Sequence, residues 1–363
     1  MYIKEIELKN FRNYDDLHLC FDKHVNFIIG NNAQGKTNLL EGIFMSSIGK
    51  SFRTSKDSEM IEFNKDFFKI KVNAQREYFQ TEIEIVLKKD QGKFIKVDGV
   101  NINKTSDLLE KIYIVIFSPE DLKIVKDDPE KRRKFIDREL CLIKPSYYDS
   151  LGNYKKVLIQ RNSYLKEKTV DNSVLDIWDM QLAKYGAKII SMRDDFIKKI
   201  NILSSRIHSS ITQGKENLIV EYDPNVKPSE KTEKNLYNEL KNSVENDLRL
   251  RTTTKGPHRD DMQFFIDGIN VRNFGSQGQQ RTAALSLKLA ELDLIKEETG
   301  ENAILLLDDV MSELDSGRQE FLVKTLKDVQ LFITSTEIAE NLRSSAEKGK
   351  IYIVKEGLIS SEK

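Results

Sequence analysis

The residues best suited to chemistry in this sequence lie in GNNAQGKTNLLEG, from Gly30 to Gly42, which follows the apolar run VNFIIG. Four of them match the spacing G-x-x-x-x-G-K-[ST]: Gly30, Gly35, Lys36 and Thr37. In such a loop, backbone N–H groups wrap phosphates at the positive end of a helix. The lysine reaches the β- and γ-phosphates, and the hydroxyl can bind Mg²⁺. The pattern predicts a nucleotide site.

A pair of acids supplies the second part of such a site. The run ILLLDD places Asp308 and Asp309 after four apolar residues, which is typical of a buried parallel strand. Ligands bind at the C-terminal edge of the strands in open α/β sheets. We expect Asp308 to join Thr37 in a metal shell and Asp309 to orient or deprotonate the attacking water. Lys36, Asp308 and Asp309 are the predicted catalytic residues.

A third polar segment, FGSQGQQR, begins at Phe274 and opens a predicted helix upstream of that strand. Ser276 and Gly278 at the helix N-terminus form another phosphate-seeking site. The loop at Gly30 already accounts for one nucleotide, so the spare site implies a second subunit.

Composition restricts the class of protein. The chain has 363 residues, about two domains, and its 58 basic and 58 acidic residues cancel, so net charge does not indicate nucleic-acid binding. Its apolar runs are strand-length, which predicts neither a membrane span nor a signal peptide. The two cysteines, Cys20 and Cys141, lack CxxC spacing and support neither a disulfide framework nor a zinc site. We expect a soluble protein of the reducing cytoplasm.

Hydrophobic periodicity divides the chain into three parts. These are residues 1–118, mostly strands with one helix after the phosphate loop; residues 119–254, a helical insert; and residues 255–363, again β/α. The insert begins with Asp128 as N-cap and Pro129 as first helical residue, and strand patterns disappear for about a hundred residues. Its four-three apolar spacing predicts two helices joined near KTVDNS, the second of about 35 residues. The fold class is α/β, with two pieces forming one split head.

The order of the motifs resembles a known superfamily. S-x-G before LLLDDVMSELD resembles the signature, Walker B and D-loop series of ABC-type ATPases. Seven segments, NFRNY, GNNAQGKTNLLE, FSPEDL, RRKFID, GPHRDD, SQGQQR and LLLDDVMSELD, resemble in order the pattern of the RecF family of bacterial recombination mediators, in the SMC and DNA-repair branch. The resemblance implies an ABC-type ATPase head, with mixed β-sheets around a P-loop core, split by a helical, coiled-coil-like arm.

The resemblance also implies roles for residues. ATP would be bound by Arg12, Gly30, Asn31, Asn32, Ala33, Gln34, Gly35, Lys36, Thr37 and Asn38. The second chain would contribute Ser276, Gln277, Gly278, Gln279 and Asp315. The cofactors are then ATP and Mg²⁺, the latter held by Thr37 and Asp308.

In function, the resemblance implies an ATP-dependent homodimer that binds duplex DNA and single-strand/double-strand junctions. It implies no membrane partner. It would serve recombinational gap repair, with RecR and RecO, by helping to load RecA. Three departures from the wider superfamily predict slow hydrolysis. Asp309 replaces the usual glutamate, Thr334 to Thr336 replace a histidine, and Glu120 or Asp121 stands where a glutamine is expected.

The segment KDDPEKRRKFIDR carries the candidate DNA contacts. These are Lys131, Arg132, Arg133 and Lys134. Such contacts would be salt-sensitive and independent of sequence, but interleaved acids leave a solvated helix surface as the alternative. For GPHRDD, from Gly256 to Asp261, fastening of the insert to the head and a DNA or nucleotide role both stay open.

Other classes of function are weaker interpretations. A transporter ATPase subunit lacks support because the expected glutamine and histidine are missing. A structural chromosome protein of SMC type would need a longer arm and a hinge. A nuclease would need a further acidic metal cluster.

Overall fold

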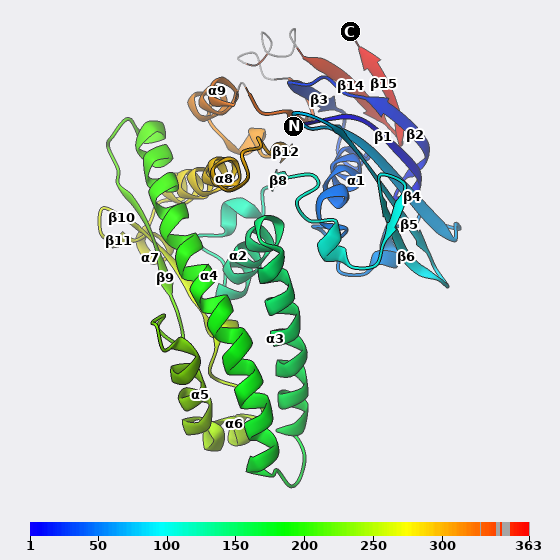
Figure 1. The fold of residues 1–363 in the computed structure, drawn as a ribbon. Coiled ribbons are helices and arrows are strands. Elements are labelled where there is room, and N and C mark those ends of the chain that lie inside the picture. The colour runs from blue at the N-terminus through cyan, green and yellow to red at the C-terminus, as the bar shows by residue number, and fades with distance from the viewer. Residues whose placement is uncertain (327, 339–341, 343–348, 363) are drawn as a thin grey trace. The chain divides into compact units, whose positions relative to one another are not determined.

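The computed structural model describes residues 1–326, 328–338, 342 and 349–362 (Figure 1). They pack into two compact units: the head unit, Met1–Asp121 with Glu291–Lys363, and the arm unit, Leu122–Ala290. Packing thus groups residues 255–290 with the arm, while the three functional parts expected from the sequence stay a prediction. Among the described residues, no helix is both long and apolar enough to cross a membrane.

The central sheet of the head unit has six strands in the order β15-β14-β3-β13-β12-β8. They are β3 (Val25–Ile29), β8 (Ile114–Phe117), β12 (Ile304–Asp308), β13 (Leu331–Ser335), β14 (Lys350–Lys355) and β15 (Leu358–Glu362). All neighbours are parallel except β14 and β15. Strands such as β12 are buried throughout, and β12 is apolar up to Asp308, because both faces of a parallel sheet are covered. Since β3 and β8 precede the insert and the other strands follow it, the predicted split α/β head is confirmed.

A second sheet of the head unit is antiparallel, in the order β2-β1-β4-β5-β6-β7. Its strands are β1 (Tyr2–Phe11), β2 (Tyr14–Cys20), β4 (Phe67–Gln75), β5 (Gln80–Lys88), β6 (Gly92–Val97) and β7 (Val100–Ile102). Burial alternates along β4 and β5, so that one face is apolar and the other is charged. The apolar face shares one core with α1 (Lys36–Ile48) and the central sheet. A further helix of the head unit is α9 (Ser316–Thr325).

The arm unit is mainly helical, with described helices of 4 to 41 residues. In chain order they are α2 (Pro129–Ile143), α3 (Pro145–Tyr164), α4 (Asn172–Thr212), α5 (Thr232–Asn242), α6 (Val244–Leu250), α7 (Val271–Phe274) and α8 (Gln277–Thr299), the last of which continues into the head unit. Figure 1 shows α3 and α4 side by side, as the four-three spacing predicts. With 41 residues, α4 exceeds the expected length and reaches about 60 Å at 1.5 Å per residue.

Two strands were missed by the sequence pattern. In the arm unit, β9 (Leu218–Asp223) pairs antiparallel with β10 (Asp261–Ile266), next to β11 (Ile269–Asn270). The expectation of a strand-free insert is therefore wrong at β9, whose six residues alternate for too short a distance to stand out. In the head unit, β2 was overlooked because two consecutive exposed residues, Asp15 and Asp16, interrupt its alternation.

Candidate functional site

Two glycines shape the loop between β3 and α1. Gly35 is the N-cap of α1, with a φ of 119° that side chains rarely adopt, and a Cβ there would lie 2.6 Å from Asn13 Nδ2. At Gly30, a Cβ would collide with the carbonyl oxygen of Val354 in β14. The two positions exclude larger residues, so the backbone can follow the tight path of a phosphate loop.

The ammonium group of Lys36 lies inside this loop. Its Nζ donates to the carbonyl oxygens of Gly30 at 2.7 Å and Asn31 at 3.1 Å, and the residue is only 4% exposed. A buried ammonium needs strong acceptors around it. Phosphate oxygens are charged and therefore stronger acceptors than carbonyls, so Lys36 is placed to exchange one for the other.

Asp308 lies at the C-terminal end of β12, as expected for a parallel strand. Its Oδ1 accepts hydrogen bonds from Thr37 Oγ1 at 2.8 Å and from Thr334 Oγ1 at 3.0 Å. Burial raises the pKa of the Asp308 carboxyl, against the opposing effect of these two hydrogen bonds. A hydroxyl and a carboxylate at this distance are hard oxygen donors suited to Mg²⁺. The structure thus brings together the predicted metal pair, Thr37 and Asp308.

The backbone of Asp309 is held in an unusual conformation. Its φ is 52°, in the left-handed region, and its N–H donates to Thr334 Oγ1 at 2.9 Å. The buried Thr334 therefore contacts both acids of the predicted pair. One threonine hydroxyl fixes the carboxylate of Asp308 and the main chain of Asp309, which gives the position a definite structural role.

The loop and Asp309 line a pocket of about 480 Å³, within the size range of small-ligand sites. Its lining residues are Asn32, Ala33, Gln34, Gly35, Lys36, Thr37, Asn38, Arg53 and Asp309. Arg53 was missed by the sequence analysis. Its guanidinium donates to Asn38 Oδ1 at 2.7 Å. Its signal in the sequence was a basic residue in the polar loop KSFRTS after α1, which matches no motif.

Arg12 does not line this pocket. Its Nε and terminal nitrogen donate to the two carboxylate oxygens of Glu41, at 2.8 and 2.7 Å, and it also donates to the carbonyl of Glu59. Glu41 is fully buried and needs such a partner. Arg53 Nη1 lies 3.4 Å from the same carboxylate. Arg12 is thus connected to the pocket through Glu41 and Arg53.

The predicted signature residues open helix α8 in the arm unit. Ser276 Oγ accepts from the N–H of Gln279 at 3.2 Å, and Gln279 Oε1 accepts from the N–H of Ser276 at 2.9 Å, which forms a capping box. Ser276, Gln277 and Gly278 are exposed. A Cβ on Gly278 would meet only Ser276 Oγ, at 3.9 Å. Nothing within the described chain therefore requires a glycine at 278.

Two further predicted acids occupy turns. Asp315, exposed, is the N-cap of α9, and its Oδ1 accepts from the N–H of Arg318 at 3.0 Å; this hydrogen bond lowers the pKa of Asp315. Asp121 accepts from the N–H and hydroxyl of Ser118, at 2.8 and 2.9 Å. Neither Glu120 nor Asp121 lines the described pocket.

The four predicted DNA-contacting cations differ sharply in exposure. Arg132 is 1% exposed and makes a two-pronged ion pair with Asp261, at 2.6 and 2.9 Å, so the expectation that it faces DNA is corrected. Arg133 is half-buried and donates to the carbonyl of Asp260. Lys131 and Lys134 are exposed, and each pairs with an acid four residues earlier: Lys131 with Asp127, just before α2, and Lys134 with Glu130.

The GPHRDD segment binds the helices of the arm unit to one another. Asp260 is fully buried and accepts from Arg193 at 2.9 Å and from the hydroxyl of Tyr222. His258 lies 2.7 Å from the hydroxyl of Tyr154 through Nδ1 and 2.9 Å from the Thr253 carbonyl through Nε2. Burial lowers the pKa of His258 to about 4, so the ring is neutral near pH 7. These contacts give the segment a structural role.

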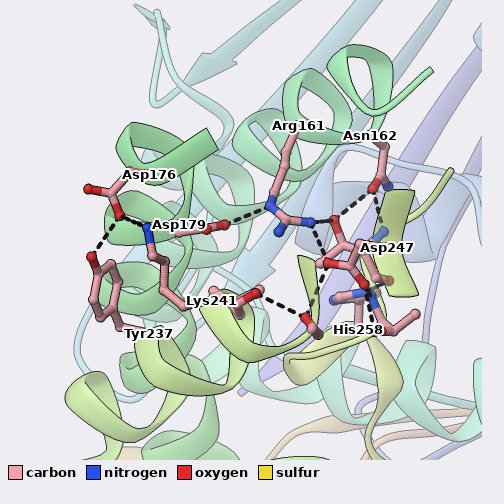
Figure 2. A network of polar contacts seen from close by, with 12 residues as sticks. Arg161, Asn162, Asp176, Asp179, Tyr237, Lys241, Asp247 and His258 are labelled. Carbon is pink, nitrogen blue, oxygen red and sulfur yellow. Dashed lines mark hydrogen bonds and ion pairs between the residues drawn. The ribbon is translucent and has the colours of Figure 1, made fainter. Parts of the chain in front are cut away.

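A second buried network centres on Arg161 of α3 (Figure 2). Its guanidinium donates to Asp179 of α4 and to Asp247 of α6, both at 2.7 Å, and to Thr253 Oγ1 at 2.8 Å. All three charged side chains are fully buried. The arm unit therefore uses its buried arginines to join helices that are distant in the sequence.

Comparison with known proteins gives consistent matches over the whole chain. The family model described as RecF/RecN/SMC N terminal domain matches residues 2–360. The chain is 47% identical to the DNA replication and repair protein RecF of Lachnospira eligens, with 100% of each chain covered. A solved structure of the recombination mediator protein RecF-ATP in the RecFOR pathway superposes with a TM-score of 0.92, at 39% identity, over 100% of this chain and 98% of that one. An Smc head domain from Pyrococcus furiosus reaches 0.56 at 16% identity, over 99% and 96%, a likeness in fold alone.

Proposed function

Because the chain belongs to the RecF family, we propose that it is an ATP-dependent DNA clamp of recombinational repair, closed as a dimer by ATP and reopened by hydrolysis. The observation that carries the proposal is the pocket lined by the phosphate loop and Asp309, in which Thr37 donates a hydrogen bond to Asp308 behind it. The names of the relatives, a replication and repair protein and a RecF-ATP structure of the RecFOR pathway, point the same way.

The residues of the pocket divide the work of nucleotide binding. The loop N–H groups and Lys36 hold the phosphates, and Arg53 adds positive charge at the rim. Thr37 and Asp308 hold Mg²⁺, which neutralises charge that develops on the phosphates. Asp309 orients or accepts a proton from the attacking water. These are the assignments that support ATP and Mg²⁺ as cofactors.

The second chain completes the site through the N-terminus of α8. Gly278 is the second residue of α8, and glycine is a weaker helix former than alanine, yet no described neighbour needs the space. The capping box uses the N–H groups of Ser276 and Gln279, so at this exposed helix start the N–H groups of Gln277 and Gly278 are available to an anion from outside the chain. We assign that anion to the nucleotide of a second copy, approached also by Asp315.

Slow turnover follows from Asp309. Its carboxylate is one methylene shorter than the usual glutamate, and Thr334 fixes its main chain, so the group has little freedom to reach a water. ATP then acts as a timed clamp on duplex DNA and single-strand/double-strand junctions. RecR, RecO and RecA are the proposed partners through the RecFOR pathway named for the solved relative.

Solution mass by light scattering tests the proposal, with no nucleotide, ADP or ATP, and with duplex DNA added. We expect ATP alone to double the mass and DNA binding to follow the dimer, while Lys36→Met and Ser276→Arg stay monomeric. Ser209→Arg, an exposed serine on α4, is the matched control and should dimerise normally. A mass that ignores ATP, or normal dimerisation of Ser276→Arg, would contradict the clamp.

A further inference from the structure

Three side chains with different metal-binding atoms meet on the outer face of the antiparallel sheet of the head unit. Glu5 lies on β1, and His18 and Cys20 lie on the edge strand β2. The strand register places Cys20 directly opposite Glu5, and His18 is two residues earlier on the same face. Because residues opposite each other in an antiparallel pair are close neighbours, the backbone itself assembles the cluster.

The spacing of the donor atoms suits one small cation. His18 Nε2 lies 3.1 Å from Glu5 Oε2, Cys20 Sγ lies 3.8 Å from the same oxygen, and the three donor atoms are all within 4.8 Å of one another. Tetrahedral Zn²⁺, with bonds of about 2.0 Å to nitrogen and oxygen and about 2.3 Å to sulfur, separates its ligands by about 3.3–3.6 Å. The cluster needs only small side-chain rotations to reach that geometry.

A neighbouring strand orients the carboxylate. Asn73 Nδ2 on β4 donates to Glu5 Oε1 at 2.6 Å, which leaves Oε2 facing His18 and Cys20. Hydrogen bonds of this kind, from groups behind the ligands, fix ligand orientation in metal sites.

We propose that Glu5, His18 and Cys20 bind a borderline-soft divalent cation, Zn²⁺ by preference, with water as the fourth ligand. Binding releases the thiol proton of Cys20 to solvent, so that a thiolate, a carboxylate and a neutral imidazole surround the ion. Sulfur and nitrogen donors select against Mg²⁺ and Ca²⁺, which separates this site from the all-oxygen pair Thr37 and Asp308. The ion fastens the edge strand β2 to β1.

Cobalt substitution tests the site on the full-length, metal-free protein. With Co²⁺, we expect a thiolate-to-cobalt charge-transfer band at one ion per chain, present with or without excess Mg-ATP. Zn²⁺ should displace the Co²⁺, and competition with a chromophoric chelator should then give the Zn²⁺ affinity. Cys20→Ser should remove the band and His18→Gln should weaken binding strongly, while Asn73→Ala should weaken it about 10- to 100-fold.

Matched substitutions separate this site from others in the chain. Cys141→Ser and His24→Gln change the other cysteine and an exposed histidine, and both should retain the band. The proposal is overturned if no thiolate band forms, if Cys20→Ser binds Zn²⁺ as tightly as the wild type, or if Mg-ATP displaces the bound Zn²⁺. Circular dichroism confirms that each variant is folded. These outcomes leave the clamp mechanism untouched, since it depends on other residues.

Discussion

The head pocket and the arm unit use charged residues in opposite ways. In the pocket, Lys36 is satisfied by backbone carbonyls alone, and Arg53 lies at an open rim. In the arm unit, Arg132, Arg161 and Arg193 are buried against carboxylates of the same chain. The cations of the pocket are placed to bind a ligand, whereas the buried arginines of the arm unit form ion pairs that hold its helices together. Similar basic residues therefore predict function in one unit and stability in the other.

Among the substitutions that test this comparison, one at Arg193 should have the largest effect, on stability. Its guanidinium bonds to Asp260, Asp137 and the carbonyl of Pro257. Arg193→Met removes the ion-pair partner of the buried Asp260 and one of the partners of Asp137, so unfolding of the arm unit should become easier by about 3–5 kcal/mol. Urea denaturation followed by circular dichroism measures the change. Lys198→Ala, which removes an exposed ion pair on the same helix, should leave the transition unmoved. Equal effects from both substitutions would refute the contrast.

The next effect concerns pH and His258. Because burial lowers its pKa from 6.5 to about 4, the folded state binds this proton less tightly than the unfolded state. Stability from this group is complete above pH 6.5 and is lost as the pH falls toward 4, by about 3 kcal/mol in total. Urea titrations at several pH values should show a weaker acid dependence for His258→Gln than for the wild type. His24→Gln should match the wild type; an unchanged acid dependence in His258→Gln would show that His258 is protonated without cost.

A smaller effect is expected at the glycines. Gly35→Ala forces a side chain into a φ of 119° beside Asn13, which should cost about 1–3 kcal/mol of stability and weaken ATP binding. Gly278→Ala should keep or slightly increase stability, because its Cβ would make only an ordinary contact with Ser276 Oγ, at 3.9 Å, but it should impair ATP-dependent dimerisation. Thermal unfolding and light scattering separate the two. If Gly278→Ala dimerised like the wild type, the proposal that Gly278 makes room for a second chain would be contradicted.

The smallest effect distinguishes the two arginines around Glu41. Arg53→Ala should weaken ATP binding about tenfold, or 1.4 kcal/mol, because its guanidinium lines the pocket. It should leave stability nearly unchanged. Arg12→Ala should instead lower stability, since it removes the two-pronged partner of a buried carboxylate. Nucleotide titration measures the ATP affinity of each variant, and thermal unfolding measures its stability. If Arg12→Ala weakened ATP binding and Arg53→Ala lowered stability, the roles assigned to the two arginines would be wrong.

The parts of the site that could be predicted are those whose residues lie close together in the sequence. The phosphate loop and ILLLDD are local patterns, so Lys36, Thr37 and Asp308 were predicted from spacing alone. Arg132 was misplaced although a signal existed: it precedes Phe135, Ile136 and Leu140 by three, four and eight residues, on the apolar stripe of α2. Because its side chain is basic, Arg132 was predicted to contact DNA, although its spacing places it on the buried face of α2.

The other contacts could not be predicted, because they depend on which strands pair in the folded sheets. Cys20 was set aside because no second cysteine lies nearby in the sequence. His18 lies two residues before it on β2, but Glu5 is brought opposite Cys20 only by strand register. Likewise, the bond between Thr334 and Asp308 depends on β13 pairing with β12, which spacing in one sequence does not reveal. The α/β class and the split head were predictable, because both ends of the chain carry strand patterns.

The central claim is that each nucleotide is enclosed by residues of two chains. Mixing Lys36→Met with Ser276→Arg tests it, because a mixed dimer contains one site with an intact loop from one chain and an intact α8 start from the other. We predict that DNA-stimulated ATP hydrolysis is absent from each variant alone and returns in the mixture, with Ser209→Arg replacing Ser276→Arg as control. A mixture no more active than the average of its two components would contradict the shared site.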